Sequence, residues 1–97
     1  MRTLVRLTID TEAGNEMIRS GRLPQVLQEL TERIRPEASY FYSENGMRTA
    51  MFFFDMKDAS EIPSIAEPAF QELGAAVEFF PVMNGNDLAA GLQKLPR

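Results

Sequence analysis

Residues 49–56 read TAMFFFDM, a stretch that alternates as a β-strand does and is nevertheless apolar on both sides. Successive side chains of a strand point to opposite faces of its sheet. One face of this strand carries Met51 and Phe53, and the other carries Ala50, Phe52 and Phe54. A sheet covered by helices on one face only would leave one of these sets in water. We therefore expect the second face to be covered too, and a second copy of the chain is the favoured cover.

The length and composition predict one ordinary folded domain over residues 1–97. The chain is 44% hydrophobic and 25% charged, values typical of a folded protein rather than a disordered one. Its net charge is −4 and its pI is about 4.8. Because affinity for nucleic acid depends largely on basic charge, this acidic balance argues against a nucleic-acid partner.

The chain contains no histidine and no cysteine. These absences exclude disulfides, thiolate chemistry, histidine-dependent nucleophile systems and imidazole metal or haem sites. We therefore expect no metal site and no cofactor. The first ten residues, MRTLVRLTID, alternate as a strand does and lack the apolar core of a secretory signal. No apolar run approaches the roughly 20 residues needed to span a bilayer, so we expect a cytoplasmic protein without membrane contact.

The first third of the chain is typical of a strand followed by two helical pieces. Alternation predicts a strand over residues 2–10, and Asp10 suits the start of a short helix. Pro24 fits the opening turn of a second helix, which Pro36 ends. A second strand is expected over residues 37–43.

Asn45-Gly46 predicts a tight hairpin between this second strand and the phenylalanine-rich one. A two-residue type I′ turn needs positive φ at both central positions, and Asn-Gly is its preferred sequence. If these two residues form the loop, the strand register follows from it. The expected cross-strand pairs are Tyr42 with Thr49, Tyr40 with Met51, and Ala38 with Phe53. A three-residue loop would instead flip one strand relative to the other.

Beyond the hairpin, apolar residues at helical spacing predict a helix that begins at Asp58 or Ser60 and ends before Gly74. Pro68 lies inside this pattern. A proline has no backbone N–H, so the hydrogen bond to the Ser64 carbonyl is lost. We expect a kink or a break in the helix at this point.

The remaining segments complete the order strand, helix, strand, strand, helix, strand and a tail helix. The last strand is expected over residues 75–83, and Asn86 is expected to cap a short helix with Leu88, Leu92 and Leu95 on one side. With right-handed crossovers, this βαββαβ order predicts an α+β, ferredoxin-like sandwich. Its four-stranded antiparallel sheet would carry helices on one face only.

The alternation divides the strand residues between the two faces of this sheet. The face that suits the helices is almost purely apolar and comprises Val5, Leu7, Ile9, Phe41, Ala50, Phe52, Val77 and Phe79. The other, open face combines apolar and polar residues: Leu4, Arg6, Thr8, Tyr40, Tyr42, Thr49, Met51, Phe53, Glu78, Phe80 and Val82. Monomers seldom leave such an apolar patch in water, so we expect a homodimer through the open face. The tail helix has two alternative positions, on its own sheet or on the neighbouring copy.

Several short stretches together carry a resemblance to a known family. They are TEAGN (11–15), RPEA (35–38), RTA (48–50), IAEP (65–68) and PVM (81–83). On these stretches the chain resembles a family of small uncharacterised bacterial proteins of the dimeric α/β-barrel superfamily. The resemblance implies a ferredoxin-like protomer that pairs into a dimeric barrel.

The resemblance also bears on activity. Similar small chains are sometimes labelled pantothenate synthetase, but that enzyme looks much larger and uses histidine-bearing motifs that this chain lacks. The wider superfamily includes cofactor-free oxygenases, haem-degrading enzymes and ligand binders. Several of these use a histidine or a tryptophan, and this chain has neither. Fold alone does not carry function.

One group of residues on the open face is the candidate site: Arg6, Tyr40, Tyr42, Met51, Phe53 and Glu78. Since the first and last strands are neighbours in this fold, Arg6 and Glu78 are expected to meet. An arginine fork in an apolar field suits a small carboxylate. The alternative is a cross-strand ion pair at the rim of a dimer, with the tyrosines as interface anchors.

Three functions are open: two of them use this candidate site, and the third is a purely structural subunit of a larger assembly. The first is a non-catalytic dimeric domain that binds a small apolar acid between its paired sheets. The second is a cofactor-independent enzyme, of oxygenase or isomerase type, in which a tyrosine or Glu78 acts as acid or base. Pairing of Glu78 with Arg6 would favour the first, and an isolated Glu78 in an apolar pocket would favour the second.

Overall fold

The computed structural model describes residues 1–96 of the chain. Its elements follow the predicted order, with a 3₁₀ turn (η1) before the third α-helix. They are β1 (Arg2–Thr8), α1 (Thr11–Arg19), α2 (Arg22–Ile34), β2 (Ala38–Glu44), β3 (Met47–Asp55), η1 (Ala59–Glu61), α3 (Ile62–Leu73), β4 (Ala76–Pro81) and α4 (Gly85–Gln93).

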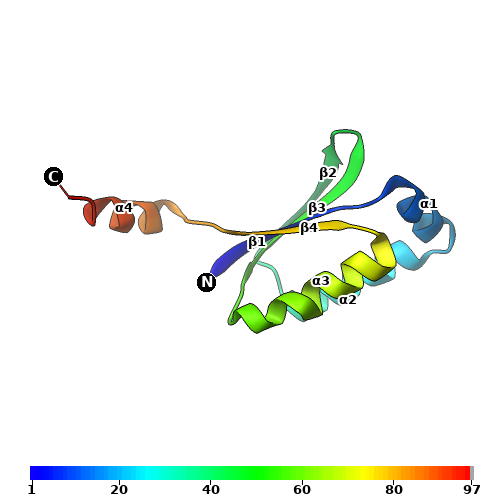
Figure 1. Cartoon of the computed structure of the whole chain (residues 1–97), viewed down its shortest axis with the longest axis horizontal. Helices are drawn as coiled ribbons and strands as arrows, with labels where there is room; N and C mark the ends of the chain where they lie inside the picture. Colours follow the sequence, from blue (N-terminus) through cyan, green and yellow to red (C-terminus); the bar gives the residue numbers. More distant parts are fainter. Residues whose placement is uncertain (97) are drawn as a thin grey trace.

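The four strands form one antiparallel sheet in the order β2-β3-β1-β4. This order, with the βαββαβ connectivity, confirms the predicted α+β, ferredoxin-like fold. Helices α2 and α3 lie together against one face of the sheet, and α1 lies at one end (Figure 1). The strands at the two edges are β2 and β4.

The β2–β3 hairpin has the predicted two-residue loop. Asn45 and Gly46 both have positive φ, 54° and 77°, and Glu44 pairs with Met47 across the loop. All three predicted cross-strand pairs are present: Tyr42 with Thr49, Tyr40 with Met51, and Ala38 with Phe53. The register therefore follows from the local turn chemistry.

The core lies between the sheet and the helices. Fully buried strand residues, Val5, Leu7 and Phe52, meet Ile65, Ala69 and Leu73 of α3 and Val26 and Ile34 of α2. Phe41 was expected to share this burial but is 60% exposed. It is on the predicted face, where its ring meets that of Phe52 edge-on at 5.9 Å. It stays exposed because β2 is an edge strand.

The helix ends confirm most of the capping predictions. Asp10 accepts a hydrogen bond from the Ala13 amide at 3.0 Å and caps α1. Asp58 begins η1 with a reciprocal capping box to Glu61, and Gly74 ends α3 with φ of 56°.

Of the two outcomes predicted at Pro68, a kink or a break, the break does not occur, because α3 is one continuous helix from Ile62 to Leu73. The Ser64 carbonyl, which Pro68 leaves without its helical donor, accepts a hydrogen bond from Arg33 Nη1 on α2 at 2.5 Å. Helix α2 thus supplies a donor for the carbonyl that the proline leaves without one, and α3 continues.

The last helix begins two residues earlier than predicted. Asn84, not Asn86, is its N-cap: the Asn84 side chain accepts from the Asp87 amide at 2.8 Å, and the Asp87 carboxylate accepts from the Asn84 amide at 3.1 Å. This reciprocal pair is a capping box, which needs an acceptor side chain three residues on. Helix α4 extends away from the sheet, at the end of the molecule opposite α1 (Figure 1).

Candidate functional site

The six predicted site residues all belong to strands β1 to β4, and the register aligns four of them. Tyr40 pairs with Met51, Met51 with Arg6, and Arg6 with Glu78. These four residues form a single row across the whole open face, which we call the central row. Phe53 lies in the adjacent row with Ala38, Leu4 and Phe80, and Tyr42 lies in the row on the other side with Thr49, Thr8 and Ala76.

Arg6 and Glu78 form a close ion pair in the central row. Arg6 Nε and Nη2 both donate to Glu78 Oε1, at 3.1 and 2.8 Å. The Arg6 guanidinium also lies over the Phe80 ring, with Cζ 5.4 Å from the ring centroid. The hydrogen bond to Glu78 raises the pKa of Arg6 further above its ordinary value, so the side chain is a permanent cation.

A second carboxylate approaches Arg6 from the edge strand. Glu44 Oε2 lies 3.7 Å from Arg6 Nη1, and Glu44 Oε1 accepts a hydrogen bond from the Tyr42 hydroxyl at 2.7 Å. This hydrogen bond raises the pKa of Tyr42. Sequence reasoning missed Glu44 because the predicted strand ended at residue 43. Its alternation with Tyr40 and Tyr42 was the signal that places it on the open face.

The aromatic members of the open face are only partly covered. Tyr40 is 61% exposed, and its ring meets that of Phe53 edge-on at 6.4 Å. Phe80, on the other edge strand, is 37% exposed. Thr49 is the buried exception on this face, and its hydroxyl donates to the Met47 carbonyl at 3.0 Å.

This geometry limits the chemistry of the open face. A general base needs a free carboxylate within reach of a substrate proton. Glu78 instead accepts two hydrogen bonds from Arg6, and Glu44 accepts one from Tyr42. The raised pKa of Tyr42 moves its phenolate further from neutral pH. One cation, Arg6, thus lies between two carboxylates, Glu78 and Glu44, among apolar side chains.

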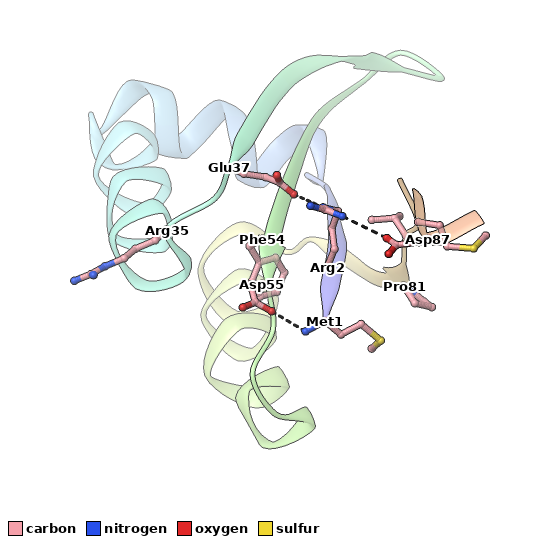
Figure 2. A pocket seen from close by; sticks show the side chains of 10 residues that line it. Met1, Arg2, Arg35, Glu37, Phe54, Asp55, Pro81 and Asp87 are labelled. Atoms are coloured by element: carbon pink, nitrogen blue, oxygen red, sulfur yellow. Dashed lines mark hydrogen bonds and ion pairs between the residues drawn. The ribbon is translucent and has the colours of Figure 1, made fainter. Parts of the chain in front are cut away.

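A hollow of about 840 Å³, which sequence reasoning also missed, lies where β1, β3 and the start of α4 meet (Figure 2). Arg2 lies at its centre. Arg2 Nε donates to Glu37 Oε1 at 2.6 Å, and Arg2 Nη1 lies 3.5 Å from Asp87 Oδ2. Figure 2 shows Arg2 between these two carboxylates, and the Arg35 side chain pointing away from them.

Asp55 forms the other charged group of this hollow. It accepts hydrogen bonds from the Lys57 side chain and from the N-terminal ammonium of Met1, the latter at 2.6 Å. These bonds, the Lys57 bond first, lower the pKa of Asp55 to about 2. Because its carboxylates are held by cations, the hollow offers no free acid or base. Little in the sequence indicates this hollow, because its charged residues come from four separate segments.

A third surface feature is an apolar groove of about 640 Å³ between the β2–β3 hairpin and helices α1 and α2. We call this feature the β2 groove. Its apolar lining residues are Ile9, Leu23, Leu27, Phe41 and Ala50.

Arg48 lies at the rim of the β2 groove, where Nη2 donates to Asn15 Oδ1 at 2.9 Å. Its guanidinium packs against Gly14 of α1, where a Cβ atom would lie 2.7 Å from Nη1. The fold thus brings together residues 11–15 and 48–50, two of the stretches that carry the resemblance.

In residues 1–96 no cluster of three or more Asp, Glu, His or Cys side chains is placed to hold a metal ion. None of the helices described is both long enough and apolar enough to cross a membrane.

No protein-family model matches the chain, and no curated protein matches it significantly.

Proposed function

We propose that this chain is a non-catalytic homodimeric domain in which the open sheet faces of two copies pack on each other. The observation that carries the proposal is the exposure of large aromatic side chains on a face that no helix covers. Tyr40 and Phe80, on opposite edges of the sheet, are both exposed, with Leu4, Met51 and Phe53 half-buried between them. Paired sheets pack about 10 Å apart, which would bury these side chains.

The free energy gained by burying the open face and the cost of association are of similar size, so pairing is energetically feasible. Full burial of a large apolar side chain contributes about 1.5–3 kcal/mol, and the cost of association is about 4–15 kcal/mol. A dimer would bury the apolar side chains of both open faces, which is twice the number on one face. Leu4, Met51, Phe53, Phe80 and Val82 are already partly covered, so the gain per side chain is less than the full value.

The charges on the open face suit a second copy better than a partner of one sign. Arg6 already has Glu78 and Glu44 beside it, so the central row carries cation and carboxylate together. A surface with both signs can face its own image across a two-fold axis with each cation near a carboxylate.

The same ion pair disfavours the two alternative functions. A carboxylate held by two donated hydrogen bonds from Arg6 is a poor general base, which disfavours the enzyme. A small apolar acid between the sheets would have to displace Glu78 from Arg6 before it could bind to the guanidinium. We therefore propose dimerisation without a ligand, with Arg6 and Glu78 as an ion pair at the interface.

The test is the molar mass in solution, measured by light scattering during size-exclusion chromatography. We expect the wild-type chain at twice its 10.9 kDa mass. Phe80→Glu on the open face should dissociate the dimer. The matched control is Phe70→Glu, since Phe70 is similarly exposed, at 45% against 37% for Phe80, but lies on α3. A wild-type chain at 10.9 kDa, or a dimer broken only by Phe70→Glu, would overturn the proposal.

A further inference from the structure

Strand β2 is an edge of the sheet whose outer side has no partner strand among residues 1–96. Its neighbour β3 is the only element in this part of the chain with which β2 makes extensive contact. The central residues of the strand, 39–43, are all exposed. An edge of this kind presents a row of unpaired N–H and C=O groups, which can pair with another strand.

The opposite edge, β4, carries two features that hinder such pairing, and β2 lacks both. Glu78 lies in the middle of β4, and Pro81, which has no backbone N–H, ends it. β2 contains no proline, glycine or lysine, and its only charged residue is Glu44 at the last position. The sequence therefore protects the β4 edge and leaves the β2 edge open to a partner.

The hydrogen bonds of the sheet show which residues of β2 point their main-chain groups outward. The Arg48 carbonyl of β3 accepts from the Ile9 amide, just beyond β1, at 2.9 Å, so the main chain of Arg48 faces away from β2. By alternation Thr49 faces β2, where it pairs with Tyr42. The residues of β2 that alternate with Tyr42 therefore direct their N–H and C=O groups away from the sheet. They are Ser39, Phe41 and Ser43.

The sequence of β2 reads the same in both directions about Phe41. Residues 39–43 are SYFYS. If two copies of this strand pair antiparallel with Phe41 opposite Phe41, then Ser39 lies opposite Ser43 and Tyr40 lies opposite Tyr42. The three outward-pointing residues of each copy also lie opposite one another, so both strands can complete their hydrogen bonds. The stretch is thus self-complementary in its side chains and in its main chain.

The side chains of this pair fit without a charge conflict. Glu44 would lie opposite Ala38, so the carboxylates of the two copies do not face each other. Phe41 is 60% exposed although it lies on the helix side of the sheet. In the pair its ring lies beside the same ring of the other copy, and aromatic pairs across strands stabilise a sheet. A second copy of β2 is therefore the occupant that suits this edge.

We propose that β2 pairs antiparallel with β2 of a second copy, across a two-fold axis that passes between the two Phe41 residues and is normal to the sheet. The contact joins two four-stranded sheets into one sheet of eight strands. The axis keeps the helices of both copies on the same side, so both open faces stay free for the proposed dimer. The inference goes beyond that dimer and does not depend on it.

The edge contact and the dimer through the open faces together would build a tetramer. One strand pair buries less surface than a whole sheet face. The edge contact should therefore be the weaker of the two and should appear at higher protein concentration, as an association of dimers.

Disulfide cross-linking tests the register directly, because the wild-type chain has no cysteine. Ser39→Cys and a tagged Ser43→Cys chain are mixed and oxidised with copper phenanthroline, and we expect a mixed disulfide on a non-reducing gel. Each variant alone is the matched control. Its two cysteines would lie about 13 Å apart along the strands, four residues at about 3.4 Å each, which is beyond the reach of a disulfide. The controls should give about tenfold less product.

Sedimentation equilibrium measures the strength of the edge contact. A lysine on an edge strand opposes pairing, so Phe41→Lys should weaken the association of dimers by about tenfold. Phe70→Lys is the matched control on α3, where Phe70 is also exposed, and should leave the association unchanged within about twofold.

The outcomes separate the two proposals. Mixed product no more abundant than in the controls overturns the edge contact, whatever the state of the dimer through the open faces. Phe80→Glu, which should break that dimer, should leave the cross-link between residues 39 and 43 intact. A wild-type dimer that Phe41→Lys dissociates and Phe80→Glu does not would support the edge contact and overturn the dimer through the open faces.

Discussion

Arg33 on α2 donates from Nη1 to the backbone carbonyl of Ser64 on α3, at 2.5 Å. Ser64 lies four residues before Pro68, so its carbonyl is the one that the proline leaves without a helical donor. The contact joins the two helices at the point where α3 is intrinsically weakest.

Arg33→Met should therefore lower the free energy of unfolding by about 1 kcal/mol, the typical net value of such a hydrogen bond. The measurement is urea denaturation followed by circular dichroism. The control is the same change in a Pro68→Ala background, where residue 68 regains an N–H that can bond to Ser64. There the loss should be clearly smaller. Equal losses in both backgrounds would show that the bond does not compensate for the proline.

Gly14→Ala should reveal how closely Arg48 packs on α1. In an exposed helix interior, alanine is more favourable than glycine by about 1 kcal/mol. Here the new Cβ would lie 2.7 Å from Arg48 Nη1 and 3.2 Å from Ile9 Cγ2, so the guanidinium must move and its bond to Asn15 is lost. We expect a net loss of stability from Gly14→Ala in the wild-type background, measured by thermal or urea denaturation. In an Arg48→Ala background the same change should cost less, and an unaltered cost would assign the strain to Ile9 instead.

Asp55 should make the free energy of unfolding depend on pH in the acid range. Its pKa is lowered to about 2 from the ordinary 3.8, first by the hydrogen bond from Lys57. A lowered pKa in the folded state means that the unfolded chain binds the proton more readily. The contribution is therefore complete above the unfolded pKa and is lost as the pH falls from about 4 towards 2. Urea midpoints across this range should fall less steeply in Asp55→Asn. Lys57→Met should move the loss to higher pH, and an unchanged profile in both variants would contradict the assignment.

Tyr42 should ionise above the ordinary phenol value of 10.0, because its hydroxyl donates to Glu44. The hydrogen bond stabilises the neutral phenol, and the carboxylate charge opposes the phenolate. The chain has two tyrosines and no tryptophan, so Tyr40→Phe leaves Tyr42 as the sole reporter in a tyrosinate absorbance titration. In that background, Glu44→Gln should shift the midpoint to lower pH. A midpoint that does not move would show that the hydrogen bond is absent in solution.

Much of the fold and part of the site were predictable, because the signals are local. Asn45-Gly46 determines the hairpin loop, and alternation then assigns each side chain of β2 and β3 to a face. The pairing of Arg6 with Glu78 followed from the βαββαβ order, which makes the first and last strands neighbours.

The charge partners of this face were harder to predict. Glu44 approaches Arg6 from the far edge of the sheet, and Arg2 meets Glu37 and Asp87 from distant parts of the chain. Which charged side chains form pairs depends on how far each one reaches across the strands and on the direction of α4. Neither quantity has a period or spacing in the sequence.

The amino-acid sequence by itself thus determined the strands, most helix ends, the hairpin register and the two-sided apolar character of β3. These features depend on contacts between residues close in the chain or on strand alternation. Only the tertiary structure decided that α3 passes unbroken through Pro68, that Phe41 stays exposed at the sheet edge and that α4 points outward. In each case the reason is a partner, present or missing, from a distant element: Arg33 for Ser64, a covering helix for Phe41, and Arg2 for the start of α4.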